Sequence, residues 1–193
     1  IGSPIEAETI ILERDLQLVR LTGARYHAAH LTTATSVEAV RRAKNEGLPV
    51  TADTSAPYFQ LNELAVSTYS SAAKLNPPLR TEDDRQAIMA ALADGTIDVI
   101  ASDHVPVNPD MKHLPFSLAS CGASGLEVML VMTLRLVLND VISWQRAFEL
   151  LSLAPATILD IPGGSLVVGT EADIVLIDPR TSWIVTGRDF NSL

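Results

Sequence analysis

Cysteine, positive charge and long apolar runs are all scarce in this sequence. The single cysteine, Cys121, excludes a disulfide framework and a zinc cluster built on thiolates, and it fits a protein of the reducing cytoplasm. Fourteen Lys and Arg residues against 23 Asp and Glu residues give a net charge of −9. Dedicated nucleic-acid-binding proteins need a basic face that displaces counterions, so the composition argues against that class.

Apolar runs are too short to suggest a membrane protein. The most apolar stretch, residues 126–138, includes Glu127 and Arg135 and is too short to cross a bilayer. The first residues show no signal-peptide pattern, so we expect a cytoplasmic protein with no membrane segment. Hydrophobic residues make up 47% of the 193 residues and charged residues 19%. This composition is typical of a folded domain with a substantial core, and the length permits one domain, or one domain plus a small appendage.

Helix signals recur along the first hundred residues. Capping-box patterns, each a Ser or Thr followed three residues later by an acidic residue, predict helix starts at Ser3, Thr35 and Thr81. Glycines suited to helix ends follow each of them, at Gly23, Gly47 and Gly95. Short strand candidates lie between these helices, at residues 25–31, 49–54 and 97–102. Alternation of strands and helices predicts βαβ units in a parallel sheet.

The remaining segments divide into long connections, helices and a β-like tail. Residues 58–79 and 105–125 are long connections at the carboxyl ends of strands, where α/β proteins commonly carry functional groups. Residues 126–160 read as helical with a break near Ser143. Residues 163–169 and 173–179 predict two short β segments joined by a turn, at the edge of a second unit. The simplest interpretation of the two tryptophans, Trp144 and Trp183, is that they are core or interface residues.

Two strand ends carry side chains that suit chemistry. His30 closes the first strand candidate, and it is either a metal ligand or a hydrogen-bonded structural histidine. His27 is three residues earlier, so in a strand the two imidazoles would face opposite ways and would not share a metal. Asp103 directly follows an apolar strand, where it is either a ligand or general base, or a turn or helix-cap residue.

The long connections supply the other candidates. Asn76 precedes two prolines and Arg80 follows them, so Asn76 suits an amide or carboxylate and Arg80 an anion. The alternative, a proline-stiffened turn ahead of the next helix, is the simpler interpretation. Residues 121–125 (Cys-Gly-Ala-Ser-Gly) precede a helix, and their backbone amides could face an anion, although a glycine pair is a weak signal.

Four segments taken in order resemble dihydroorotases of the amidohydrolase superfamily. Residues 30–33 (His-Leu-Thr-Thr) are similar to the family's strand end His-[Val/Leu]-Ser-Thr, and residues 74–80 (Lys-Leu-Asn-Pro-Pro-Leu-Arg) to its Lys-Val-Asn-Pro-Pro-Leu-Arg. Residues 94–98 followed by residues 102–106 resemble its Asp-Gly-Thr-Ile-Asp and Thr-Asp-His-Ala-Pro run. Residues 122–127 resemble its Gly-Ala-Val-Gly-Leu-Glu turn.

This resemblance implies an α/β fold. Residues 1–160 would be the carboxyl-terminal half of a (β/α)₈ TIM barrel of the metal-dependent hydrolase type. Residues 161–193 would be part of an appended β-sandwich domain. The strand candidates at residues 25–31, 49–54 and 97–102 would then be the sixth, seventh and eighth strands of the barrel.

The same resemblance implies a zinc amidohydrolase with one or two metal ions. His30 would be a metal ligand, and Asp103 both a ligand and the proton shuttle. Asn76 and the backbone around Cys121 and Gly122 would contact the substrate. The implied reaction is the reversible hydrolysis of dihydroorotate to N-carbamoyl-aspartate in pyrimidine biosynthesis.

Several of the family's metal ligands have no counterpart in this sequence. These are the first-strand His-x-His pair with its accompanying arginine, the fourth-strand carboxylate or carboxylated lysine, and the fifth-strand histidine. His30 and Asp103 alone fall short of the three or four protein ligands that zinc usually has. We therefore expect the 193 residues alone to be inactive and the missing half of the barrel to be required, from the same polypeptide or another chain.

Two departures inside the matched part leave other functions open. Val107 stands where the family has a substrate-contacting histidine, and residues 55–58 (Ser-Ala-Pro-Tyr) replace Thr-Pro-His-His. Both favour a non-catalytic homologue that serves as a partner of aspartate transcarbamoylase. Another cyclic amidohydrolase, an allantoinase or hydantoinase, is a third hypothesis, from which residues 76–78 (Asn-Pro-Pro) point away. In each case we expect a homo-oligomer, and in the catalytic cases a small-molecule substrate.

Overall fold

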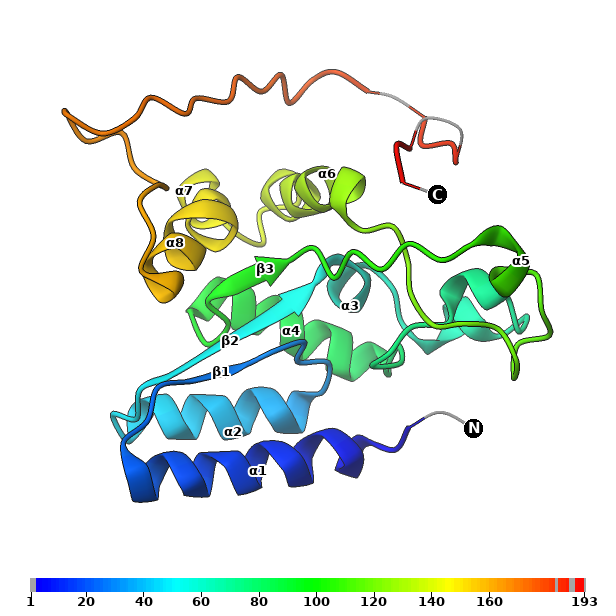
Figure 1. Ribbon diagram of the computed structural model, residues 1–193, viewed down its shortest axis with the longest axis horizontal. Helices are drawn as coiled ribbons and strands as arrows, with labels where there is room; N and C mark the ends of the chain where they lie inside the picture. Colours follow the sequence, from blue (N-terminus) through cyan, green and yellow to red (C-terminus); the bar gives the residue numbers. More distant parts are fainter. Residues whose placement is uncertain (1–2, 183, 188–189, 193) are drawn as a thin grey trace.

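The centre of the structure is a small parallel sheet (Figure 1). The computed structural model describes residues 3–182, 184–187 and 190–192. Three strands, β1 (Tyr26–Ala28), β2 (Val50–Ser55) and β3 (Val99–Ala101), lie side by side in the order β1-β2-β3, and both pairings are parallel. The predicted βαβ arrangement is therefore confirmed, although β1 and β3 are shorter than the predicted segments.

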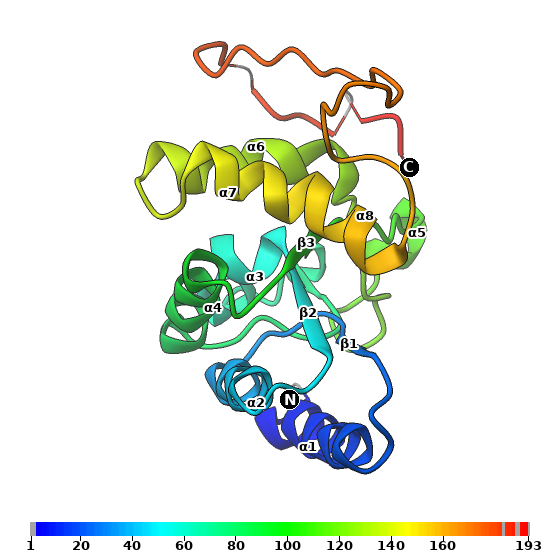
Figure 2. The same ribbon diagram turned by 90° about the vertical axis from the view of Figure 1, so that its left-hand side faces the viewer.

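Helices follow the sheet from one edge to the other, as two perpendicular views show (Figures 1 and 2). α1 and α2 pack together below β1, α2 also packs against α4, and α6, α7 and α8 lie above β3. The bounds are α1 (Ile5–Thr22), α2 (Ala34–Asn45), α3 (Ala56–Gln60), α4 (Glu82–Asp94), α5 (Pro109–Lys112), α6 (Leu126–Leu138), α7 (Trp144–Phe148) and α8 (Ala154–Leu159). Two 3₁₀ turns (Glu63–Val66 and Ser71–Ala73) and a π-helical turn (Glu149–Leu153) complete the elements. The predicted helical stretch after residue 126 is confirmed, with its break between α6 and α7.

The core lies where these helices meet the sheet. Its largest fully buried side chains come from α1, α2, α3, α4, the turn before β3 and the π-helical turn: Leu16, Val37, Val40, Phe59, Ile88, Leu92, Ile97 and Leu150. Removal of such side chains from water is the main favourable contribution to folding. The packed helices and sheet thus hold the carboxyl ends of the strands in fixed positions. Within the described residues, no helix is both long and apolar enough to cross a membrane.

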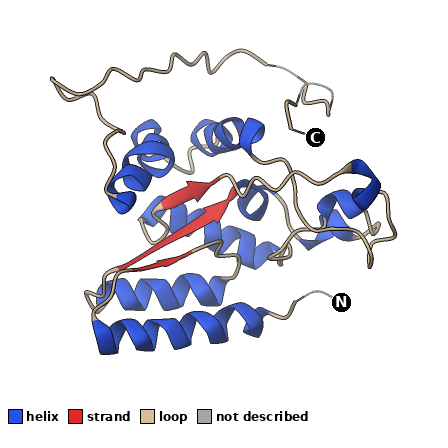
Figure 3. Cartoon of the chain, viewed as in Figure 1, coloured by secondary structure: helices blue, strands red, loops and turns tan. Residues whose placement is uncertain are grey.

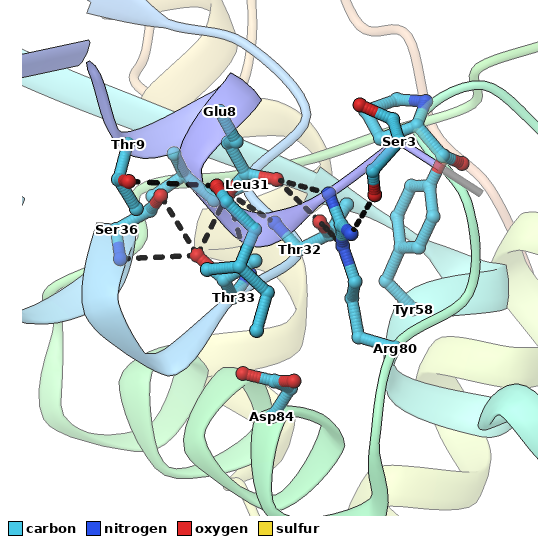
Figure 4. Close-up of polar contacts among 12 residues, drawn as sticks. Ser3, Glu8, Thr9, Leu31, Thr32, Thr33, Ser36, Tyr58, Arg80 and Asp84 are labelled. Carbon is cyan, nitrogen blue, oxygen red and sulfur yellow. Dashed lines mark hydrogen bonds and ion pairs between the residues drawn. The ribbon is translucent and has the colours of Figure 1, made fainter. Parts of the chain in front are cut away.

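One of the three predicted capping boxes is confirmed and two are wrong. Thr81 accepts from the backbone N–H of Asp84, whose side chain accepts from the backbone N–H of Thr81. The cap of α2 is Thr33 rather than Thr35, because Thr33 Oγ1 accepts from the backbone N–H of Ser36 while Glu8 of α1 holds Thr33 by accepting its hydrogen bonds (Figure 4). The helix therefore begins two residues earlier than predicted. The cap of α1 is Pro4, with no side-chain cap.

Ser3 lies one residue before the cap position of α1, and its backbone carbonyl contacts another part of the chain. That carbonyl accepts a hydrogen bond of 2.6 Å from the Arg80 guanidinium. Two of the predicted helix ends are confirmed in conformation, since Gly23 and Gly95 both cap their helices with positive φ values of 68° and 88°. Gly47, with φ 79°, directly follows the cap residue of α2.

The prediction of two β segments after residue 160 is wrong, because these residues form no regular strand. The structure assigns no strand to the described residues beyond α8, and they form an extended, largely exposed tail (Figure 3). A strand needs a neighbour for its backbone hydrogen bonds, and residues 163–169 and 173–179 pair with no strand in the described part of the chain. The predicted turn between them is present, since the backbone N–H of Thr170 donates to the Val167 carbonyl. Trp183 lies outside the described residues, whereas Trp144 stacks on Phe148 with its ring centroid 6.4 Å away.

Two long connections gather beyond the carboxyl ends of the strands, on the right of Figure 1. The α3–α4 loop (residues 61–81) contains the two 3₁₀ turns, and the β3–α6 loop (residues 102–125) contains α5. The predicted long connections are thus confirmed.

Candidate functional site

The carboxyl ends of β1 and β3 bring His30 and Asp103 together. Each residue lies two positions beyond the end of its strand, and His30 Nε2 is 3.9 Å from Asp103 Oδ1. Both residues have positive φ values, 57° for His30 and 44° for Asp103. Such a backbone is uncommon for residues other than glycine and is often found at functional sites. The structure therefore pairs the two residues that the sequence analysis proposed as metal ligands.

A third side chain, Asp53 of β2, lies beneath this pair and was missed by the sequence analysis. Its carboxylate is 8% exposed and accepts a hydrogen bond of 2.9 Å from His27 Nε2. It also accepts from the backbone N–H of His30 at 2.7 Å, and His30 Nδ1 is 3.1 Å away in a bent contact. The available signal was an acidic residue in the interior of a predicted strand of the parallel sheet.

The expectation that His27 and His30 face opposite ways is wrong. Both imidazoles contact Asp53, His27 from within β1 and His30 from the turn after it. The strict alternation of a strand does not apply because β1 ends at Ala28 and the positive φ of His30 turns its side chain back over β2. His27 also lies 2.7 Å from Thr51 Oγ1, so it acts as a bridge between β1 and β2.

The charges of this cluster favour an ionised Asp53 carboxylate. Burial alone would raise the pKa of Asp53, but hydrogen bonds from His27 and His30 outweigh burial and lower that pKa to about 2. The contact with Asp53 raises the pKa of His30, burial opposes this, and the charges of Asp53 and Asp103 add to the rise. Because Asp53 contacts Nδ1, the Nε2 atom is the one that faces Asp103.

The donors fit part of a metal site. Zinc bonds to histidine nitrogen and carboxylate oxygen are about 2.0–2.2 Å long, so two donors 3.9 Å apart can share one ion. A histidine ligand commonly has its second ring nitrogen held by a carboxylate, as Asp53 holds His30. In the described part of the chain, no group of three or more His, Cys, Asp and Glu side chains is placed to hold a metal. The described residues thus bring together two candidate donors, His30 and Asp103, and a carboxylate, Asp53, that contacts one of them.

The proposed substrate residues lie on the two long loops. Asn76 and Cys121 are exposed and line one cavity of about 640 Å³, and Asn76 also borders a second cavity of about 270 Å³ that His30 lines. The backbone N–H of Gly122 donates to the Lys74 carbonyl at 3.1 Å, so this amide is not turned toward the cavity. Only glycine fits there, because its φ is 132° and an added Cβ would lie 2.6 Å from the Val105 carbonyl oxygen.

Arg80 has a structural position rather than an anion-binding one. Its side chain is 8% exposed, with one nitrogen donating to Thr32 Oγ1 and another 3.7 Å from the Glu8 carboxylate (Figure 4). Tyr58, in the segment that departs from the dihydroorotase pattern, is buried and donates to the Pro77 carbonyl at 2.8 Å. Burial raises the pKa of Tyr58, and the charges of Asp103 and Glu8 raise it further.

Comparison with known proteins decides the family. Residues 5–192 match the amidohydrolase family. The chain belongs to this family. A dihydroorotase from Desulfotalea psychrophila is 49% identical over 190 residues, which are 97% of this chain and 45% of that protein. One from Syntrophotalea carbinolica is 48% identical over 182 residues, 94% of this chain and 43% of that protein.

The resemblance of this amidohydrolase chain to dihydroorotases is thus confirmed. The chain spans less than half the length of these relatives. Solved structures agree on the fold. An L-hydantoinase (dihydropyrimidinase) from Arthrobacter aurescens superimposes with a TM-score of 0.83 and 27% identity, over 88% of this chain and 39% of that protein. A D-hydantoinase superimposes with a TM-score of 0.73 and 28% identity, over 79% of this chain and 35% of that protein. The fold is of the TIM-barrel type, and the family implies a metal cofactor.

Proposed function

We propose that this chain carries part of the active site of a dihydroorotase. The reaction would be the reversible hydrolysis of the cyclic amide of dihydroorotate to N-carbamoyl-aspartate, a step of pyrimidine biosynthesis. The observation that carries the proposal is the His30–Asp103 pair, 3.9 Å apart at the carboxyl ends of β1 and β3. Identity of up to 49% with proteins named dihydroorotase supports this choice of substrate.

In this proposal His30 Nε2 and the Asp103 carboxylate hold a zinc ion, one of one or two in the site. When bound, zinc makes hydroxide available near neutral pH and polarises an amide carbonyl. Asp53 fixes the ring orientation of His30, and it keeps Nδ1 from turning toward the site. A complete zinc site needs donors in addition to His30 and Asp103.

Asp103 has the second role of proton carrier. Its carboxylate accepts the proton of the attacking water and returns it to the leaving ring nitrogen. The side chain is 17% exposed, so part of it is accessible from outside the protein. In the biosynthetic direction the same carboxylate takes a proton from the carbamoyl nitrogen as this nitrogen attacks the side-chain carboxyl carbon, and it passes the proton to the carboxyl oxygen that departs as water.

Substrate contacts come from the two long loops. The exposed Asn76 amide would hydrogen-bond a ring carbonyl or the carboxylate of dihydroorotate, from a position that borders both cavities. Cys121 and the backbone beside Gly122 would form the opposite wall. These assignments give the ring a fixed orientation relative to Asp103.

We also infer the place of this chain in the larger fold. β1, β2 and β3 would be the sixth, seventh and eighth strands of a (β/α)₈ barrel formed by residues 1–160 with further strands. Residues 161–193 would belong to an appended β-sandwich. The parallel order β1-β2-β3 and the hydantoinase neighbours support the barrel, and the exposed apolar residues of the tail, such as Val168 and Leu176, support a further packing partner for it.

A substrate comparison tests the proposed function. The protein in its full natural length, supplied with zinc, should open dihydroorotate and close N-carbamoyl-aspartate, and it should act poorly on hydantoin, allantoin and dihydrouracil. Asp103→Asn should lower kcat by about 10²–10⁴-fold, the usual contribution of a proton-transferring residue. Asp98→Asn, a carboxylate at the amino end of β3 that pairs with Lys44, serves as the matched control. Preference for hydantoin or allantoin would reassign the substrate, and equal rates for the Asp103 variant and the wild type would refute the role of Asp103.

A second candidate is a non-catalytic partner of aspartate transcarbamoylase. It is favoured by Tyr58, which is buried against Pro77 where dihydroorotases of the resembling pattern have histidine, and by Val107. This candidate predicts co-migration with aspartate transcarbamoylase in size-exclusion chromatography with light scattering, together with no turnover of dihydroorotate. Turnover of dihydroorotate by the isolated homo-oligomer would reject it.

A further inference from the structure

Each of the two long loops extends a lysine side chain that hydrogen-bonds to the other loop. Lys74 of the α3–α4 loop reaches into the β3–α6 loop, where its Nζ donates to three backbone carbonyls. Their donor–acceptor distances are 2.8 Å to Phe116, 3.2 Å to Ser117 and 2.6 Å to Ala119. These three acceptors use all three protons of the ammonium group. The Phe116 ring also lies 5.5 Å from Lys74 Nζ, within range of a cation–π contact.

Lys112 makes the reverse connection. It belongs to α5 in the β3–α6 loop, and its Nζ donates to the carbonyls of Ser71 at 3.0 Å and Lys74 at 3.2 Å in the α3–α4 loop. The Ser71 hydroxyl donates in return to the Lys112 carbonyl. Each loop therefore satisfies carbonyl groups of the other through a charged donor.

Neither ammonium group forms an ion pair within the described residues, so carbonyl oxygens, together with the Phe116 ring beside Lys74, stabilise the two charges there. Burial lowers the pKa of Lys112, the charge of Cys121 opposes this, and the charge of Lys74 lowers it further. Hydrogen bonds from charged donors are stronger than neutral ones. Separation of the loops would leave both lysines without these partners at the same time.

Shared hydrogen bonds and a shared cavity connect the two lysines with the proposed substrate residues. The Lys74 carbonyl accepts from Lys112 Nζ and also from the backbone N–H of Gly122. Asn76 lies two residues after Lys74, and it lines the same cavity of about 640 Å³ as Lys74 and Cys121. The distance across this cavity therefore depends on how the two loops are joined.

We propose that Lys74 and Lys112 are positioning residues that join the α3–α4 and β3–α6 loops into one unit and so set the separation of Asn76 from Cys121 and Gly122. The proposal rests on the proposed function for its effect on substrate, but its structural part concerns the loops alone. It predicts reciprocal behaviour, because removal of either lysine loosens both loops and uncovers the other lysine.

The lysine content allows a direct test. This chain has three lysines, and the third, Lys44, binds Asp98 and the Gly95 carbonyl at the amino ends of the strands. We would label the protein in its full natural length with acetic anhydride and follow each lysine by peptide mass spectrometry. Lys112→Met should raise the labelling rate of Lys74 about tenfold, and Lys74→Met should do the same for Lys112. Labelling of Lys44 should not change in either variant, which also shows that the fold is intact.

Matched controls separate loop joining from general destabilisation. Lys44→Met removes a half-buried lysine that donates to one backbone carbonyl and to the Asp98 carboxylate, and it should leave the labelling of Lys74 and Lys112 unchanged. Lys74→Arg keeps the charge and several donors, so it should restore most of the protection of Lys112. Unchanged labelling of the remaining lysine in both Met variants would overturn the proposal.

Kinetics then test the effect on substrate. Lys74→Met and Lys112→Met should raise KM for dihydroorotate about tenfold with a smaller change in kcat, and Lys74→Arg should recover most of the loss. If the labelling of the lysines is reciprocal but KM is unchanged, the lysines join the loops without positioning Asn76 and Cys121, and that part of the proposal is overturned. Lack of dihydroorotate turnover by the wild type would contradict the proposed function, whereas the labelling result would still decide whether the lysines join the loops.

Discussion

Replacement of Asp53 by asparagine removes the charge on which His27 and His30 converge while it keeps the size of the side chain. The wild-type carboxylate accepts from His27 Nε2 and from the His30 backbone N–H, and it contacts His30 Nδ1. The interactions that hold its pKa near 2, below the ordinary 3.8, correspond to roughly 2.5 kcal/mol of stability at neutral pH. Because the side chain is 8% exposed, screening by solvent takes away little of this amount.

The pH dependence of this contribution follows from the direction of the shift. The pKa of Asp53 is lower in the folded protein than in the unfolded chain, so the stabilisation is complete above about pH 5 and is lost as the pH falls toward 2. Asp53→Asn should therefore lower the free energy of unfolding by about 2–3 kcal/mol at pH 7. The difference from the wild type should shrink to roughly half at pH 3.

Urea denaturation of the wild type and the variant between pH 3 and pH 7 measures this difference. Zinc affinity, measured by competition with a chelator, should fall about 10–100-fold in Asp53→Asn, because His30 loses the group that orients its ring. Asp98→Asn is the matched control, since Asp98 accepts from Lys44 and from the backbone of Ala52 at the other end of the sheet. It should reduce stability without a change in zinc affinity. Equal stability and equal zinc affinity for Asp53→Asn and the wild type would refute the reasoning.

Two further predictions concern the backbone around the site. Thr81→Ala removes the confirmed capping box of α4 and should lower the free energy of unfolding by about 1 kcal/mol in urea denaturation, whereas no loss would contradict the cap. Gly125→Ala would place a Cβ 2.1 Å from the Ser102 carbonyl oxygen, next to Asp103, and should cost about 1–3 kcal/mol and reduce turnover. Gly23→Ala is the control, because an added Cβ there meets open space. It should reduce stability, since the backbone has a positive φ, and it should leave turnover unchanged. Equal turnover for the Gly125 and Gly23 variants would contradict the close approach at Ser102.

The parts of the fold that depend on local pattern were predictable from the sequence. The alternation of strands and helices gave the parallel sheet, and the positions of Thr81, Gly23 and Gly95 gave helix boundaries. The proximity of His30 and Asp103 follows from their positions at the carboxyl ends of parallel strands of one sheet, and the family resemblance pointed to these two residues.

The parts that depend on contacts between distant segments were not predictable. The cap of α2 is Thr33 because of Glu8, which is 25 residues earlier in the chain. His27 and His30 converge because the backbone of His30 has a positive φ, which strand periodicity does not contain. Local spacing likewise gives no sign of the hydrogen bonds that join Lys74 and Lys112 to loops about 40 residues away. The tail after α8 has β-like patterns but no strand partner among the described residues.

The position of the metal is the most direct test of the account as a whole. We would crystallise the protein in its full natural length with zinc and collect anomalous diffraction at the zinc absorption edge. The account predicts a zinc peak at about 2.0–2.2 Å from both His30 Nε2 and the Asp103 carboxylate, with Asp53 on the opposite ring nitrogen of His30. Zinc bound away from this pair, or bound through His30 Nδ1, would contradict it.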